Sequence, residues 1–440
     1  MTFGESARLH HAAARAFDTV SPEKSITHYA RAMELIGQVT DSSDDRTKRE
    51  FAAIAANLAQ ARIRVGEIDA ARMLLIDTAA PIFERFGDVR GLAVTKGQIA
   101  DILQARGDLD EALRIRREEE IPVYERLGDV HSLAVTKGQI ADILQARGEL
   151  DEALRIRREE QIPVYERLGD VRELAVTKGK IADILQARGD LDEALRIRRE
   201  EQIPVYERLG DVRALAVTKG KIADILQARG DLDEALRIRR DEQIPVFERL
   251  GDLRELAIAK AMCAQVLVAQ DEGDQIVPAM REFAEAVMLL AQCQAYPELA
   301  KVAIDAAQIA AKGGHHREVQ RASAAGAWAS LLLNESSQAG QFLAYFSMAS
   351  IHRGAPFPKI LLDAAVAAVG LTENDDVKKQ LAPIVGAAAQ AVGIADEDFP
   401  KWLEEHNKRL DTEGFINMVA PGLLDAINQP PAGGRGADRP

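Results

Sequence analysis

The side chains of this chain that could do chemistry are its histidines, its two cysteines and its many carboxylates. Two pairs of adjacent histidines, His10–His11 and His315–His316, are the first candidates for metal ligands. Neighbouring residues of a helix point to different sides, however, and a metal needs several ligands that converge on one point. The sequence has no HExxH motif and no cysteine pair at zinc spacing. We therefore expect no metal site and no cofactor.

The other reactive groups give no sign of a catalytic site. Cys263 lies in the apolar run "AMCAQVLV", which favours a packed thiol. The stretch "TKGK" at 177–180 lacks the glycine spacing and the Ser or Thr of a phosphate-binding loop. Many carboxylates recur in copies of one motif, whereas catalysis needs different residues that meet at one point. We expect a protein that is not an enzyme, and only residues 335–428 leave room for one.

Composition limits the class of protein further. Apolar residues make up 47% of the 440 residues and aromatic residues only 5%, a mixture rich in alanine and leucine that favours close-packed helices. The net charge of -14 disfavours a nucleic-acid binder, because phosphate contacts need an excess of Lys and Arg. No run approaches the roughly 20 apolar residues that span a bilayer, and no signal peptide is evident. With only two cysteines, we expect a cytoplasmic protein that does not bind membranes.

A repeat of 41 residues organises the chain. The unit "GDVRGLAVTKGQIADILQARGDLDEALRIRREEEIPVYERL" begins at Gly87 and returns almost unchanged three times. Glycines keep this spacing at Gly66, Gly107, Gly148, Gly189 and Gly230. Prolines keep it at Pro81, Pro122, Pro163, Pro204 and Pro245. Such a period indicates stacked supersecondary units that bury a continuous core only together.

Each unit is predicted to contain two helices. The first covers about residues 89–106, with apolar residues at helical spacing, and ends at Gly107. Asp108 and Glu111 form a capping-box pattern at the start of the second helix, and Asp129 can cap the next unit. Pro122 predicts a bend in the second helix, or a break with Pro122 as the first residue of a short new helix. The dense charges around it, with pairs four residues apart, indicate a solvated face.

The stretch "IADILQARGDLDEAL" resembles the signature of the tetratricopeptide repeat (TPR) family. The matching positions are a small residue at Ala100, a large apolar residue at Leu103, the turn glycine Gly107 and Ala112 in the second helix. The period exceeds the family's 34 residues, as in its long-helix variants. Arg116 departs from the family pattern, which has an aromatic residue there. The resemblance covers about residues 45–290 and implies an all-α, right-handed α-solenoid of tandem helix-turn-helix repeats.

The resemblance also implies where a partner would bind. In this family one face of each first helix lines a concave groove. Here that face would carry Val94, Gly97, Asp101 and Gln104 and their copies. The candidate partner-binding residues are four carboxylates and four amides: Asp101, Gln104, Asp142, Gln145, Asp183, Gln186, Asp224 and Gln227. They suit an extended peptide with spaced basic or polar groups. Alternatively, the aspartates pair with Lys96, with Arg106 or with a neighbouring unit.

The pattern divides the chain into five parts. Residues 1–44 are expected to form an N-terminal helical cap, and residues 45–292 the repeat array, with near-identical units over 87–250. Residues 293–334 fit a degenerate repeat. Residues 335–428 read as a non-repeating helical segment, and the Pro/Gly-rich residues 429–440 as a disordered tail.

Two functions fit this organisation. The first is a protein–protein interaction scaffold that binds a peptide segment or a partner subunit in the groove, because identical units suit many weak contacts on one frame. The second is a regulatory sensor that binds a peptide or small effector, changes its superhelical pitch and signals through residues 335–428. The sequence leaves the partner's identity and the oligomeric state open.

Overall fold

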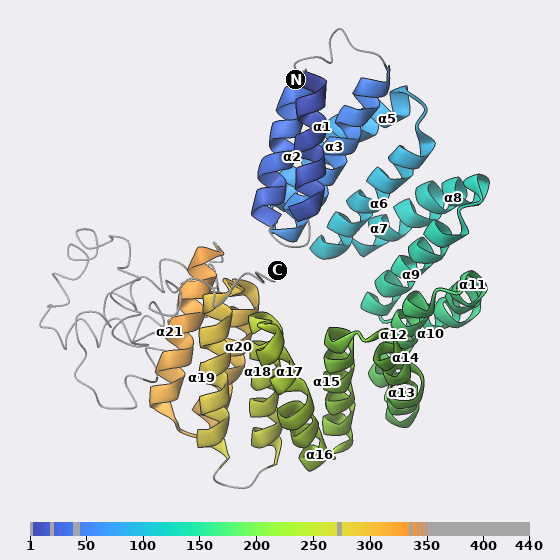
Figure 1. Ribbon diagram of the computed structural model, residues 1–440. Coiled ribbons are helices and arrows are strands. Elements are labelled where there is room, and N and C mark those ends of the chain that lie inside the picture. Colours follow the sequence, from blue (N-terminus) through green and yellow to red (C-terminus); the bar gives the residue numbers. More distant parts are fainter. Residues whose placement is uncertain are drawn as a thin grey trace, which may run out of the picture. The chain divides into compact units, whose positions relative to one another are not determined.

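The computed structural model describes residues 3–17, 22–37, 45–270 and 275–333, together with a few positions between 338 and 349. Every regular element in these ranges is helical, and Figure 1 shows the helices following one another in pairs. The chain divides into two compact units, residues 1–205 and 206–440. The division falls inside a single short helix, α14 (Ile203–Leu209), within the near-identical repeats.

The first unit contains the N-terminal helices, the first two near-identical repeats and most of the third. Its elements are α1 (Phe3–Phe17), α2 (Pro22–Gly37), α3 (Asp45–Arg64), α4 (Ile68–Met73), η2 (Leu74–Ala79), α5 (Ala80–Arg85), α6 (Val89–Arg106), α7 (Leu109–Arg114), η3 (Ile115–Glu120), α8 (Ile121–Leu127), α9 (Val130–Ala146), α10 (Leu150–Arg155), η4 (Ile156–Gln161), α11 (Ile162–Leu168), α12 (Val171–Arg188), α13 (Leu191–Arg196) and η5 (Ile197–Gln202). The label η marks a π-helical segment. The long helices α6, α9 and α12 are the first helices of these repeats.

The second unit continues the series and ends in more divergent pairs. Its elements are α15 (Val212–Arg229), α16 (Leu232–Arg237), η6 (Ile238–Gln243), α17 (Ile244–Leu250), α18 (Leu253–Ala269), α19 (Ile276–Gln292), α20 (Tyr296–Lys312) and α21 (His316–Leu332). Helix α15 is the first helix of the fourth near-identical repeat. The structure therefore repeats at the period that the sequence predicted.

Side-chain caps and glycines define the first helices. The carboxylates of Asp88, Asp129, Asp170, Asp211 and Asp252 each accept a hydrogen bond from the backbone N–H three residues later. This satisfies one of the donors that a helix start leaves open. The predicted cap at Asp129 is thus confirmed. The capping box at Asp108 is wrong, because Asp108 makes no side-chain cap bond and Glu111 pairs with Arg114 instead.

The second helix of each repeat is continuous but contains a π-helical turn before its proline. In the second near-identical repeat, η4 links α10 to α11, and the N–H of Ile162 donates to the carbonyl of Arg157, five residues back. Proline lacks an N–H and crowds the carbonyl four residues before it. A wider turn relieves this crowding without ending the helix. The predicted break, with the proline as the first residue of a new helix, is therefore wrong. Pro163 is the second residue of α11, and the backbone stays helical on both sides of it.

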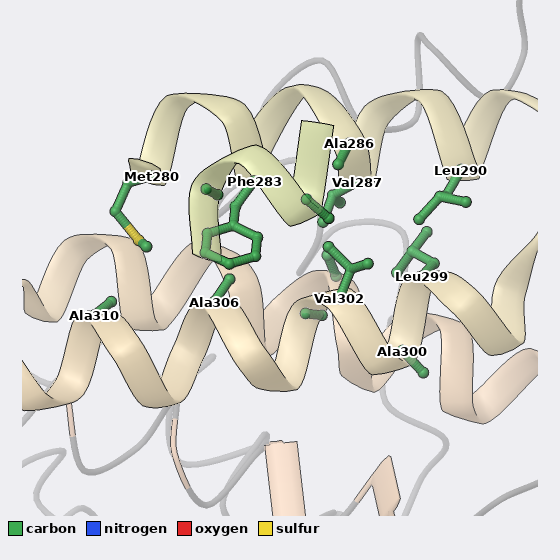
Figure 2. Packing of buried hydrophobic residues seen from close by; sticks show 14 of the residues in the cluster. Met280, Phe283, Ala286, Val287, Leu290, Leu299, Ala300, Val302, Ala306 and Ala310 are labelled. Carbon is green, nitrogen blue, oxygen red and sulfur yellow. The ribbon is translucent and has the colours of Figure 1, made fainter. Parts of the chain in front are cut away.

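The cores combine many alanines with larger apolar side chains. In the N-terminal pairs, Tyr29 and Ile36 of α2 pack with Ile54 of α3 and a set of buried alanines. In the second unit α19 packs antiparallel on α20, and Figure 2 shows Phe283 lying over Ala306 and Leu290 over Leu299. Small residues let helices approach closely, so the few aromatic and leucine side chains fill the remaining space.

Ion pairs also join consecutive repeats at both ends of the first helices. At one end Arg90 pairs with Asp129 at 2.6 Å, and Arg213 repeats this contact with Asp252 at 2.9 Å. At the other end Arg147 pairs with Asp110 of the preceding repeat at 2.8 Å. These pairs are largely exposed, and such pairs contribute little stability each. Because they recur at a regular spacing, they instead favour one alignment of each repeat against the next.

The described part of the chain is an all-α, TPR-like array of tandem helix pairs, as the sequence predicted. None of the described helices combines the length and the apolar content needed to cross a bilayer. The predicted helical segment 335–428 lies almost entirely outside the described residues, and the predicted tail 429–440 lies wholly outside them. The five-part division of the chain remains a prediction.

The turn glycines generate a test of local strain. Gly169 has a φ of 68°, and a Cβ at this position would meet no atom within 4 Å, so only the backbone conformation resists a side chain. Gly169→Ala is expected to lower the unfolding free energy by about 1–2 kcal/mol. Gly169→Asn should cost less, since asparagine tolerates this conformation. Urea unfolding followed by circular dichroism measures both, and equal losses would contradict the explanation.

Candidate functional site

The predicted binding residues lie on the first helices of the near-identical repeats. Each of α6, α9, α12 and α15 contributes one aspartate and, three residues later on the same face, one glutamine. All eight residues are partly buried. The aspartate side chains keep 40%, 32%, 31% and 28% of their surface exposed, in the order Asp101, Asp142, Asp183 and Asp224. The first three lie in the first unit and Asp224 lies in the second.

A buried arginine holds each of these carboxylates. In the second of the near-identical repeats, Arg157 reaches from η4 to α9 with only 3% of its side chain exposed. Its Nη2 donates to Asp142 Oδ1 at 2.7 Å and to the carbonyl oxygen of Gly138 at 3.3 Å. Its Nη1 donates to Gln161 Oε1 at 3.0 Å. Burial lowers the pKa of the Arg157 guanidinium, and the nearby Asp142 opposes that shift.

The other three repeats contain the same network. Arg198 donates to Asp183 at 2.6 Å and to Gln202 at 3.0 Å. Arg116 and Arg239 bond Asp101 and Asp224 in the same way. The four guanidinium groups are between 0% and 3% exposed. Each network joins the two helices of one repeat, so the aspartates have a structural role whatever else they contact.

This geometry decides between the pairings that the sequence left open. Asp101 pairs with Arg116 rather than with Lys96, which contacts Glu119, or with Arg106, which contacts Asp69. Pairing with a neighbouring unit occurs at Asp142. Lys180 of the next repeat lies 3.2 Å from its Oδ1.

Gly97 does not line a surface, contrary to its predicted place on the binding face. It is buried in the middle of α6, and a Cβ there would lie 2.7 Å from Glu120 Oε1. Its copy Gly138 leaves equally little room for Gln161. Glycine is therefore needed here because a second-helix side chain packs directly against the backbone of the first helix.

Glu120 distinguishes the first of the four repeats from the others, which carry Gln161, Gln202 and Gln243 at this position. It accepts from Arg116 Nη1 at 2.8 Å and from the Thr136 hydroxyl at 3.2 Å. Arg116 thus faces two carboxylates, Asp101 and Glu120. Burial raises the pKa of both acids, and Arg116 reduces the shift without cancelling it.

The prediction of a solvated charge block is only partly correct. Arg114 is exposed and pairs with Glu111 at 2.8 Å and with Glu118 at 3.4 Å. Arg116 and Glu120, in the same block, are buried, so that part of the prediction is wrong. The signal that could have indicated this was present in the sequence. Arg116 occupies a position where the TPR resemblance expects a buried aromatic side chain.

The sequence predicted the packing of Cys263 but not the contacts of the histidines. His10 Nδ1 of α1 lies 3.0 Å from His28 Nδ1 of α2, a contact that sequence spacing does not reveal. Within the described ranges no group of three or more His, Cys, Asp or Glu residues is placed to hold a metal. Cys263 is fully buried, and burial raises the pKa of its thiol to about 11, which disfavours the reactive thiolate.

Comparisons with known proteins give structural likeness at low identity. No family model and no curated protein sequence matches this chain. The chain is similar to the crystal structure of BtubC (BKLC) from P. vanneervenii, with 17% identity and a TM-score of 0.44. That match covers 52% of this chain and 92% of that one.

Two further solved structures are similar. A putative kinesin light chain from Podosopora anserina with nearly identical TPR-like repeats shows 17% identity and a TM-score of 0.37, over 46% of this chain and 95% of that one. A Signal Transduction ATPase with Numerous Domains with a tetratricopeptide repeat sensor, from Pyrococcus horikoshii, shows 14% identity and a TM-score of 0.39, over 90% of this chain and 56% of that one. At these low scores none of the functions named for these proteins transfers to this chain.

The two carboxylates around Arg116 predict a pH-dependent stability. The folded pKa of Glu120 is raised, so its contribution to stability falls as pH rises through the range between its unfolded and folded pKa values. Glu120→Gln is therefore expected to raise the melting temperature at neutral pH, and the gain should shrink as pH falls through that range. Gln161→Glu should have the opposite sign. Thermal scans at several pH values measure both, and a pH-independent difference would contradict this account.

The buried arginines predict that the aspartates are needed for folding. Asp142→Ala leaves Arg157 without its counter-ion and is expected to cost about 3 kcal/mol or more. Adding Arg157→Met should recover most of the loss, because the unpaired buried charge is removed with it. The exposed Glu159→Ala is the matched control and should cost less than about 0.5 kcal/mol. Chemical unfolding compares the three, and the prediction fails if the double variant is no more stable than Asp142→Ala.

Proposed function

We propose that this chain is a protein-interaction scaffold that binds an extended peptide segment or a partner subunit along the face of its first helices. The supporting observation is the anchored row of polar groups on α6, α9 and α12. Each aspartate has one oxygen held by a buried arginine, while a third or so of its side chain stays exposed. Groups fixed in this way lose little side-chain freedom when they bind a partner.

The charge balance of this face indicates which partner would fit. Because a buried guanidinium neutralises each carboxylate, the row offers hydrogen-bond acceptors without a strong negative field. Val94 and Val176, with 44% and 37% of their surface exposed, lie about two helical turns before the aspartates on the same helices. The best-matched ligand is a polar, near-neutral segment with amide donors and small apolar side chains.

Repetition supports binding over catalysis. Identical copies present the same small patch several times, which strengthens binding through many weak contacts. A catalytic centre would need unlike residues at one point. As part of the same proposal the chain is not an enzyme and takes no cofactor. It works in the cytoplasm, where its two free thiols fit a reducing environment.

One contact favours the regulatory sensor as a second candidate function. Lys180 and Asp142 join neighbouring first helices on the proposed binding face, and their side chains are 43% and 32% exposed. A ligand that takes over Asp142 would displace Lys180 and change the contact between two repeats. Solution scattering with and without ligand separates the candidates, since a scaffold keeps its dimensions and a sensor changes them.

The glutamines provide the cleanest test, because changing an aspartate also removes the counter-ion of a buried arginine. Peptides selected from a random display library on the full chain should lose at least about tenfold in affinity for the triple variant Gln104→Ala, Gln145→Ala and Gln186→Ala. The matched control changes Glu118, Glu159 and Glu200, which are equally spaced and exposed on the second helices. If both triple variants bind equally well, this face is not the binding site.

A further inference from the structure

The second unit contains a cavity away from the arginine networks. It has a volume of about 520 Å³ and lies between α19 and α21, with Ala306 of α20 also in its wall. Volumes of this size are typical of small-molecule sites, which span about 300–1,000 Å³. The near-identical repeats do not contribute to it, so it is independent of the proposed peptide face.

The inner wall of the cavity is apolar and adaptable. Phe283, Met280 and Val287 of α19 are between 1% and 8% exposed and form the deeper part. Figure 2 shows Phe283 and Met280 pointing from α19 toward α20. Val277 stands near the start of α19 with 57% of its surface exposed. Methionine side chains have flexible, polarisable ends that adjust to the shape of an apolar ligand.

The polar part of the lining carries excess positive charge. Arg281 comes from α19 and Arg321 from α21, so the two guanidinium groups belong to different walls. Both are exposed, and neither forms a salt bridge with any acid in the described ranges, unlike most arginines of the repeats. Among the described residues that line the cavity, Glu318 is the only acid, and His315 also lines it.

We propose that this cavity binds a small amphipathic anion, namely a free carboxylate with an alkyl body such as a medium-chain fatty acid. The alkyl body lies against Phe283, Met280 and Val287, and removing it from water drives binding. The carboxylate accepts hydrogen bonds from Arg281 and Arg321, for which a planar guanidinium is well shaped. Neither the apolar wall nor the arginines alone would select this class of ligand.

The first experiment measures binding of octanoate, decanoate and decanol to the full chain by isothermal titration calorimetry. Each added CH2 group that enters the cavity should tighten binding about fourfold. Decanoate should bind more tightly than decanol, by about tenfold if both arginines contribute. The proposal would be overturned if no ligand binds saturably or if decanoate and decanol bind equally well. It would also be overturned if the chain binds phosphatidylglycerol vesicles but none of these free ligands.

Variants locate the site. Ala284 is an exposed residue of the lining, so Ala284→Trp should block the cavity without disturbing the core and should abolish decanoate binding. Ala311→Trp, at an exposed position of α20 outside the lining, is the control and should bind normally. Arg321→Ala should weaken decanoate but not decanol, whereas Arg317→Ala on the same helix should change neither. Decanoate binding that survives Ala284→Trp would place the ligand elsewhere and overturn the assignment.

Discussion

A buried guanidinium that spans two helices is the interaction on which each near-identical repeat depends. Arg157 and its counterparts are removed from water, and a charge in that position is tolerated only when it is paired and hydrogen-bonded. The aspartate of the first helix, the glycine carbonyl one turn earlier and the residue four positions after the arginine supply these partners. Each of these groups is placed to satisfy the arginine, and the glycine also leaves room for the side chain of the residue four positions after the arginine.

The π-helical turn and the arginine belong to one arrangement. In the near-identical repeats the turn begins beside the arginine and ends one residue before the last α-helical segment, so Arg157 and Gln161 lie in the same wide turn and both face inward. The proline that follows explains why the turn is wide, since a regular turn would bring its ring against a carbonyl. The repeated proline therefore has a structural role in every copy.

Much of this fold could be predicted from the sequence. The turn glycines and the apolar spacing placed the first helix at 89–106, and α6 has those bounds. The burial of Arg116 was not predicted, because a run of charges with pairs four residues apart is equally compatible with a solvated helix. The His10–His28 contact depends on how two helices pack, which no local pattern states. For the proposed binding face, the sequence placed the aspartates and glutamines on the first helices, where the structure also has them. It could not reveal that arginines from the second helix already hold the carboxylates.

The recurrence of the same contacts between repeats has a consequence for how this gene can evolve. The ion pair between Arg90 and Asp129 recurs between Arg213 and Asp252, at the end of the near-identical repeats. Unequal recombination that inserts or deletes one whole 41-residue period would keep most of each junction, because consecutive repeats differ at few positions, such as His131, which takes the place of Arg90 in the second repeat. Alleles that differ by whole repeats would then keep the same kind of contact between neighbours, and selection could adjust the number of repeats one copy at a time.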